Sequence, residues 1–426
     1  MIVTLPCGRG LLEASVPDNT RVVTIRNTPG IADPAGEIRR GLKNPIGTRP
    51  LPDIIRSKRP ENVCVVISDH TRPVPNKTIL PPLLDILENG GISPKNITIL
   101  IATGMHRETT HEEKIELVGA DILSRYAVIA HDSESDDLVH FDVHGIQATV
   151  NGFYCSAGLK ILTGFIEPHY MAGFSGGRKA ICPGISGVAT VRYFHSPALL
   201  ESPRANPGML DGNPCHDFSS RVAECAGADF MVNVTLNAAK EITGVFCGDI
   251  LKAHQAGIAF SEHEASVFCG EPADIVVTTN GGFPLDRDLY QTTKGLVSAL
   301  DIVREDGLII CASECCDGLG SSPFKRLLSE MTTPEDFLAM ISAPDYFHMD
   351  QWGVEELVKV LKKARIMLYS TGLTSDEICM CRCEPIKSIE EGIQKETARL
   401  GRSPTVTVIP DGPYIIAKSG SGGEER

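Results

Sequence analysis

The sequence lacks several features that would assign it to a special class. No stretch approaches the roughly 18 apolar residues that cross a bilayer, and the start, MIVTLPCGRG, has neither the basic head nor the apolar core of a signal peptide. Basic residues are in deficit, with 40 Lys and Arg against 54 Asp and Glu and a formal net charge of −14. These absences predict a cytoplasmic protein that binds neither membranes nor nucleic acids.

The CxxC spacing is also absent, although the chain has 14 cysteines. In a reducing cytosol these are expected to be free thiols. Two clusters stand out, CASECC (residues 311–316) and CMCRC (residues 379–383). The alternating cysteines of the second cluster would share one face of a strand. That face would either pack beside a core or hold a metal or iron–sulfur centre, and the pattern leaves both interpretations open.

What the chain does have is a repeated alternation of short apolar runs, polar or glycine-containing loops and helical stretches. NVCVVISD, NITILIATG and LKILTGFIE show it first, and DIVVTTNGG, GLIICASE, ARIMLYSTG and TVTVIPDG show it again. This predicts an α/β protein with mostly parallel sheets. The 426 residues suggest two domains, residues 1–270 and 271–418, and a disordered tail at 419–426. Because ligands lie beyond the carboxyl ends of parallel strands, we expect one active site in a cleft between the domains.

Polar residues follow the predicted strands of the first domain. In SDHTRPVP, the prolines keep the loop extended, so Asp69, Thr71 and Arg72 project from a stiff turn. Arg72 suits a phosphate or a carboxylate, although an Asp–Arg pair that fixes the loop is an equally good interpretation. His106 follows ATG, and His169 follows a further strand. Both histidines suit acid–base chemistry, but a histidine in a surface loop explains His106 as well.

The segment GFSGGRKA (residues 173–180) resembles a phosphate-binding loop. It fails the Walker A pattern, because Arg178 precedes the lysine and Ala180 follows it. A glycine-lined pocket at Gly176 and Gly177 remains, which can accept a phosphate. Lys179 at its rim can pair with that phosphate or serve as a point of covalent attachment.

Three further sites have two interpretations each. His195, in VRYFHSP, is either a packing histidine or a metal ligand near the lysine loop. Tyr290, Gln291 and Lys294 share a helix face through their i, i+3 and i+4 spacing, which either clamps a carboxylate or faces solvent. Trp352, the single tryptophan, is either a packing anchor or a stacking surface for an aromatic ligand.

Taken in order, SDHTRPVP, ATGMHR, GFIEPHYMAGFSGGRKAICPGI, FHSP and FPLDRDLYQTTKG resemble the motifs of the nickel-dependent lactate racemase family. They span about residues 65–355, and the long central motif is specific to that family. The resemblance implies two α/β domains with the active site between them. It also implies a nickel-pincer nucleotide, a pyridinium-3-thioamide-5-thiocarboxylate mononucleotide that holds nickel.

The resemblance also assigns roles to residues that match the motifs. Lys179 would attach the cofactor covalently through a thioamide, and His195 would be the protein ligand to nickel. His106 and His169 would be the two acid–base residues. Residues expected to hold the cofactor are Asp69, Thr71, Arg72, Gly176, Gly177, Lys179, Gln291, Lys294 and Trp352. Residues expected to hold the substrate are Arg72, Tyr290, Gln291 and Lys294.

The reaction implied is racemisation of a small 2-hydroxy acid, with lactate as the first choice and malate as an alternative. Simple proton removal would create a carbanion beside a carboxylate, whereas hydride transfer to the cofactor gives a flat 2-keto acid. The cofactor would come from separate synthesis enzymes. Two other functions stay open: a phosphate-loop transferase without nickel, and a carrier that stores or delivers the cofactor.

Overall fold

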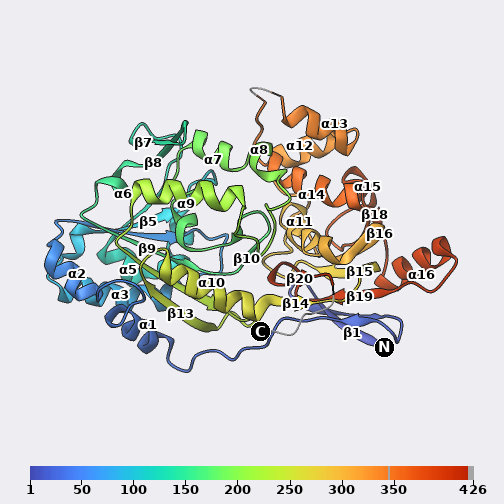
Figure 1. The fold of residues 1–426 in the computed structure, drawn as a ribbon, viewed down its shortest axis with the longest axis horizontal. Coiled ribbons are helices and arrows are strands. Elements are labelled where there is room, and N and C mark those ends of the chain that lie inside the picture. The colour runs from blue at the N-terminus through green and yellow to red at the C-terminus, as the bar shows by residue number, and fades with distance from the viewer. Residues whose placement is uncertain (344–345, 421–426) are drawn as a thin grey trace. The chain divides into compact units, whose positions relative to one another are not determined.

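Runs of continuously buried apolar residues form the central strands of two separate sheets in the computed structural model (Figure 1), which describes residues 1–343 and 346–420. The chain divides into two units by its internal contacts. The first unit comprises Asn27–Glu167 and Met171–His263. The second unit comprises Met1–Arg26, Pro168–Tyr170 and Glu264–Arg426. Each unit has its own six-stranded sheet.

The sheet of the first unit has the strand order β13-β12-β9-β4-β5-β6. Its neighbours are parallel, except that β13 is antiparallel to β12. Central strands such as VCVVIS are buried on both faces, which explains their unbroken apolar sequence. The strands are β4 (Val63–Ser68), β5 (Ile97–Ala102), β6 (Ala127–Ala130), β9 (Leu159–Phe165), β12 (Phe230–Leu236) and β13 (Ile242–Gly248), with the hairpin β7 (Leu138–Val143) and β8 (Ile146–Asn151) and the short β11 (Gly173–Phe174).

Helices cover both faces of this sheet (Figure 1). Val63, Val65 and Ile67 pack in one core with residues of α1 to α4. The alternate β4 residues point to the other face. The helices are α1 (Pro34–Lys43), α2 (Leu51–Lys58), α3 (Asn76–Asn89), η1 (Pro94–Asn96), α4 (His111–Val118), α5 (Ala120–Arg125), α6 (Gly152–Ser156), η2 (Gly177–Ala180), α7 (Val188–Phe194), α8 (Pro197–Leu200), α9 (Pro214–Ala226) and α10 (Lys252–Ala265), which begins in this unit.

The sheet of the second unit has the order β18-β17-β16-β15-β19-β3, and all of its neighbours are parallel. Val276 packs in one core and Ile275 and Val277 pack in another, as the alternation of side chains along a strand requires. The strands are β3 (Arg21–Val22), β15 (Ala273–Thr279), β16 (Val303–Ala312), β17 (Ala364–Tyr369), β18 (Glu384–Pro385) and β19 (Val406–Ile409), with β1 (Ile2–Cys7), β2 (Gly10–Ser15), β10 (Pro168–His169), β14 (Ser266–Phe268) and β20 (Ile416–Lys418).

The helices of the second unit lie between these strands in sequence. They are α11 (Leu289–Val297), η3 (Leu300–Ile302), α12 (Ser322–Glu330), α13 (Pro334–Ile341), α14 (Gln351–Lys363), α15 (Ser375–Met380), α16 (Ile389–Leu400) and η4 (Gly412–Tyr414). Within this unit, α11 packs against α14.

The predicted α/β class with mostly parallel sheets is confirmed. The predicted domain boundary near residue 270 and the cleft stay predictions. The N-terminal hairpin of β1 and β2 belongs to the second unit, a long-range association that the sequence analysis did not anticipate. Of the tail predicted to be disordered, Ser419 donates its N–H to Asp301 (2.7 Å) and Gly420 pairs with Gly270. The remainder of that tail, residues 421–426, lies outside the described residues.

The expected strand at CMCRC is wrong. Cys379 lies in helix α15, because Thr374 and Glu377 form a capping box that starts a helix there. Cys381 and Cys383 enter the hydrophobic core, where burial raises the pKa of both thiols. Among residues 1–343 and 346–420, no group of three or more His, Cys, Asp or Glu is arranged to hold a metal ion. In this segment Cys379 is exposed, and Cys381 and Cys383 are buried.

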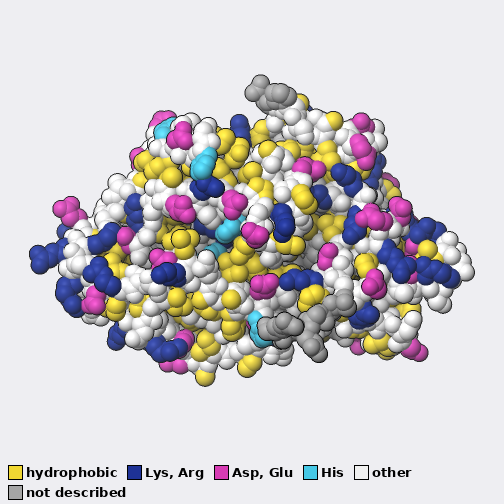
Figure 2. Space-filling view, in the orientation of Figure 1, with side chains coloured by type: hydrophobic (Ala, Val, Ile, Leu, Met, Phe, Trp, Pro, Cys, Tyr) yellow, Lys and Arg dark blue, Asp and Glu magenta, His cyan; other side chains and the backbone are white. Residues whose placement is uncertain are grey.

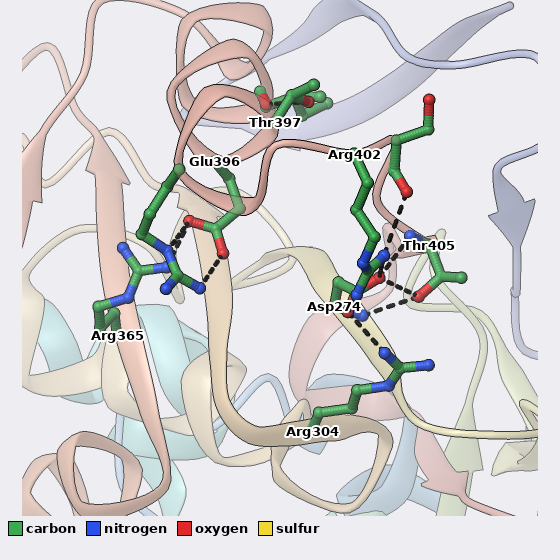
Figure 3. A network of polar contacts seen from close by, with 10 residues as sticks. Asp274, Arg304, Arg365, Glu396, Thr397, Arg402 and Thr405 are labelled. Atoms are coloured by element: carbon green, nitrogen blue, oxygen red, sulfur yellow. Dashed lines mark hydrogen bonds and ion pairs between the residues drawn. The ribbon is translucent and has the colours of Figure 1, made fainter.

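Charged side chains of both signs are interspersed over the face drawn in Figure 2. In the second unit, two buried carboxylates each form ion pairs with two arginines (Figure 3). Asp274 accepts from Arg304 and Arg402 (2.7 Å each), and Glu396 pairs with Arg365 and Arg399. In the part of the chain that the structure describes, no helix combines the length and apolarity needed to span a bilayer.

Candidate active site

The loops after β4 and β5 in the first unit bring an aspartate and a histidine together. Asp69 Oδ2 lies 2.6 Å from His106 Nδ1, and the side chains of Asp69 and His106 are 5% and 48% exposed. The other carboxylate oxygen of Asp69 accepts from the backbone N–H and the hydroxyl of Thr71, at 3.2 and 2.6 Å. Since the ionised carboxylate accepts a hydrogen bond from Nδ1–H, the lone pair of the neutral imidazole is on Nε2. His106 is therefore oriented as a base.

The surroundings of Asp69 favour the ionised form of its carboxyl group. Burial alone would raise the pKa of this carboxyl, but the hydrogen bond and charge of His106, with smaller contributions from Arg72 and Thr71, lower it to about 2. Asp69 is therefore ionised at neutral pH and is a charged acceptor for the hydrogen bond from His106 Nδ1. Sequence analysis missed this pairing. The signal that could have found it is that Asp69 directly follows β4 and His106 lies four residues after the end of the neighbouring parallel strand β5. The cofactor roles of Asp69, Thr71 and Arg72 stay predictions.

The glycine turn of the first unit is packed closely. A Cβ on Gly176 would lie 2.6 Å from Asn233 Oδ1, and a Cβ on Gly177 would lie 2.8 Å from the ring of His254. Gly177 donates its N–H to Asn233 Oδ1 (2.8 Å), and His254 Nε2 hydrogen-bonds with the carbonyl of Ser175 (2.9 Å). Both glycines have positive φ, which side chains other than glycine rarely adopt. Local packing therefore explains both glycines, and their predicted contact with the cofactor stays a prediction.

Two adjacent cationic residues follow this turn in η2. Arg178 is 2% exposed. Its Nη2 donates to the carbonyls of Ala172 (2.8 Å) and Phe174 (3.2 Å). Lys179 Nζ lies 4.8 Å from the centroid of the Phe194 ring. Burial lowers the pKa of Lys179 to about 7, and the charges of Arg178 and Arg72 act in the same direction. A large share of Lys179 is therefore the neutral amine, which is the nucleophilic form.

His195 lies at the C-terminal end of α7, against the same Phe194 ring. The two rings meet edge to face with centroids 4.8 Å apart. His195 Nδ1 hydrogen-bonds with the carbonyl of Val191 (2.9 Å), which makes Nδ1 the protonated nitrogen and puts the lone pair on Nε2. Burial, with the charge of Lys179, lowers the pKa of His195 to about 3. The ring is thus neutral, as a metal-ligating imidazole must be.

The second unit holds the remaining predicted residues. On α11, Lys294 Nζ donates to Gln291 Oε1 (2.6 Å), and the Gln291 N–H is capped by Asp288 (2.8 Å). Tyr290 accepts a hydrogen bond from Trp352 Nε1 (2.7 Å). Gln291 and Lys294 therefore lie side by side, whereas Tyr290 contacts α14, and the proposed clamp made by the three residues stays a prediction.

His169 also belongs to the second unit, within the short segment Pro168–Tyr170. Its ring lies 5.0 Å from that of Tyr170, and Lys294 Nζ lies 5.8 Å from the centroid of the Tyr170 ring. Tyr170 thus links His169 to the α11 residues. Sequence analysis did not single out Tyr170, although it directly follows the histidine in EPHY.

Comparisons with known proteins show the family of the chain. The family description "Lactate racemase N-terminal domain" matches residues 7–208, and "Lactate racemase C-terminal domain" matches residues 269–417. A lactate racemase of Thermoanaerobacterium thermosaccharolyticum is 34% identical over 425 residues, which cover 98% of this chain and 99% of the relative. A lactate racemase of Lactiplantibacillus plantarum is 37% identical over 390 residues, covering 89% and 90%.

Solved structures show the same similarity. The lactate racemase apoprotein of T. thermosaccharolyticum superposes with a TM-score of 0.92 at 32% identity, over 98% of this chain and 100% of that chain. A Thermotoga maritima protein shares the fold, with a TM-score of 0.68 at 19% identity over 91% and 99% of the chains. The chain belongs to the lactate racemase family, and the predicted family is confirmed. This family is one of isomerases.

Proposed function

We propose that this chain racemises lactate by means of a nickel-pincer nucleotide attached to Lys179. The observation that carries the proposal is the pairing around Phe194, where the Lys179 amine lies 4.8 Å from the ring centroid and the His195 ring packs edge to face. A lysine poised to lose its proton and a neutral imidazole occupy one patch of the first unit. The full-length similarity to two lactate racemases supports the substrate.

The residues present fit this cofactor. The lone pair on His195 Nε2 suits a nickel ligand, and the partly neutral Lys179 amine suits covalent attachment. Arg72 and Thr71, beside Asp69, would hold the nucleotide or the substrate, with Gly176 and Gly177 next to the attachment point. Gln291, Lys294 and Trp352 complete the proposed cofactor-binding set. When bound, the group supplies an acceptor that takes H⁻ from the substrate carbon and returns it.

The other steps belong to the side chains of the protein. His106 takes the hydroxyl proton of one enantiomer on Nε2, and the Asp69 carboxylate 2.6 Å from Nδ1 stabilises the resulting imidazolium. His169 takes the hydroxyl proton of the other enantiomer. Lys294, with Arg72, Tyr290 and Gln291, binds the substrate carboxylate and keeps the flat keto acid in place until it is reduced. The predicted cytoplasmic location and supply of the cofactor by separate synthesis enzymes belong to the same proposal.

Chiral chromatography tests the function. Cofactor-loaded protein is incubated with pure L-lactate or pure D-lactate, and with both enantiomers of malate. The expected result is convergence to equal amounts of the two lactates, at a higher kcat/KM than for malate. Lactate deuterated at carbon 2 should keep its label in both enantiomers. Washout of the label into water would instead require a carbanion route.

Mass spectrometry separates the alternatives. A covalent adduct of nucleotide mass on the Lys179 peptide is expected. A phosphate-loop transferase would show no adduct, whereas a cofactor carrier would show the adduct without any turnover of lactate.

A further inference from the structure

The side chain of Tyr290 is packed against four residues of its own unit. Trp352 Nε1 donates to the phenolic oxygen at 2.7 Å, and the Phe324 ring meets the Tyr290 ring edge to face with centroids 5.4 Å apart. Gly353 lies against the ring, since its Cβ would come within 2.6 Å of two ring carbons, and Gly320 lies against the Tyr290 Cβ, which its own Cβ would approach to 3.0 Å. The phenol thus has little freedom to move.

Gly353 is the most informative of these neighbours. It lies in the first turn of α14, where glycine is a poorer helix former than alanine. Its backbone does not have the positive φ that calls for glycine. A Cβ would, however, lie 2.6 Å from Cδ2 and Cε2 of Tyr290 and 3.2 Å from Cε2 of Phe324. The position therefore uses glycine to provide room for the Tyr290 ring.

We propose that Gly353 and Trp352 are positioning residues for Tyr290 in substrate binding. Gly353 provides the space that the ring occupies, and the Trp352 indole fixes the phenolic oxygen. Because the phenolic oxygen accepts a hydrogen bond from the indole N–H, Trp352 fixes where that oxygen lies. The inference rests on the proposed function, in which Tyr290 binds the 2-hydroxy acid.

The first test uses the apoprotein. Trp352 is the only tryptophan, so intrinsic fluorescence reports on this site alone. Removal of its acceptor in Tyr290→Phe is expected to shift the emission to shorter wavelength, and Gly353→Ala is expected to shift it as well. Val360→Ala, a core substitution in the last turns of α14, is the matched control that should leave the emission unchanged. Emission that does not respond to Tyr290→Phe and Gly353→Ala would overturn the proposed contact.

The second test is a double-mutant cycle. With Tyr290 present, Gly353→Ala should raise the KM for lactate about tenfold and change kcat by less than about threefold, as loss of uniform binding does. In a Tyr290→Ala background the added methyl group loses its two 2.6 Å contacts and keeps only the 3.2 Å approach to Phe324 Cε2. Gly353→Ala should then leave KM unchanged and raise the melting temperature, because alanine favours the helix. Equal effects of Gly353→Ala in both backgrounds would show that the glycine does not act through Tyr290.

The two tests distinguish failure of the proposed function from failure of the proposed positioning role. A wild-type enzyme that does not racemise lactate would refute the proposed function, while fluorescence and thermal unfolding would still report on the Gly353–Tyr290 contact. An active enzyme whose KM is unaffected by Gly353→Ala and Trp352→Phe would refute the positioning role alone.

Discussion

Each unit presents one candidate lysine, and the two lysines have opposite surroundings. Lys179 in the first unit lies next to an aromatic ring and the cations Arg178 and Arg72, and its pKa is lowered to about 7. Lys294 in the second unit donates to the Gln291 amide and lies near Asp288, a carboxyl whose pKa burial raises and Lys294 partly lowers again. The first environment favours a neutral, reactive amine, whereas the second surrounds the lysine Nζ with hydrogen-bond acceptors.

The carboxylates differ in a parallel way. Asp69 in the first unit holds one histidine and one threonine in the candidate site. Asp274 in the second unit holds Arg304, Arg402 and Thr405 at the start of β15, the end of a parallel strand away from ligands (Figure 3). Burial and hydrogen bonding by themselves therefore do not distinguish a functional carboxylate from a structural one. We expect the distinction to lie in the hydrogen-bonding partner, histidine or arginine, and in the end of the strand at which the carboxylate lies.

The largest effect is expected from the lysines themselves. Lys179→Ala should abolish both the covalent adduct and racemisation, because no other residue provides the attachment. Lys294→Ala should keep the adduct and raise the KM for lactate by about tenfold or more, equal to about 1.4 kcal/mol of lost binding. Intact-mass spectrometry and kinetics on both variants check this. An adduct that persists in Lys179→Ala would remove the contrast between the two lysines.

The difference between Lys179 and other lysines should also appear in the pH dependence of chemical labelling. An amine reacts with acylating reagents only after losing its proton, so Lys179 in the apoprotein should reach half of its maximal labelling rate near pH 7. Ordinary lysines do so near their usual pKa of about 10.4. Peptide mapping after brief acylation at a series of pH values measures this. Arg178→Met should move the Lys179 midpoint upward, and a Lys179 midpoint above about 9 in the wild type would contradict the assigned environment.

Replacement of the base should have the next largest effect. His106→Gln should lower kcat by about 10²–10⁴-fold, the usual contribution of a positioned acid–base group. The Lys179 adduct should remain, since His106 takes no part in attachment. The readout is kcat in both directions at saturating substrate, with adduct occupancy as the control. A variant that loses both adduct and activity would point to a cofactor role for His106 instead.

The continuous apolar runs were sufficient to predict the central strands, because such runs occur where both sheet faces are covered. The order of the strands was not readable. The 37-residue separation of Asp69 and His106 therefore hid their contact, which depends on β4 and β5 being neighbours. The contact of Gly353 with Tyr290 depends on how α11 and α14 pack, which no local pattern reveals. At Cys379, the capping box at Thr374 outweighed the alternation that suggested a strand.

Replacing Asp69 or Asp274 by asparagine is expected to have the smallest effect on activity. The pair of variants also tests directly whether the two carboxylates differ in function. Asp69→Asn keeps the shape of the side chain but weakens its hold on the His106 tautomer, so kcat should fall about 10–100-fold. Asp274→Asn should leave kcat and KM within about twofold while lowering the free energy of unfolding by about 1–3 kcal/mol, because arginine donors lose a charged acceptor.

The effect of Asp274→Asn on the free energy of unfolding should depend on pH. The hydrogen bonds of Arg402, with the backbone and hydroxyl of Thr405 and the charge of Arg304, lower the pKa of Asp274 despite its burial. A lowered folded-state pKa stabilises the protein above the unfolded value of about 3.9, and the contribution is lost as pH falls through the folded value. Urea unfolding should therefore separate wild type from Asp274→Asn at pH 7 and bring them together in strong acid. If Asp274→Asn instead changed kcat as much as Asp69→Asn does, position along the strand would not distinguish a functional carboxylate from a structural one.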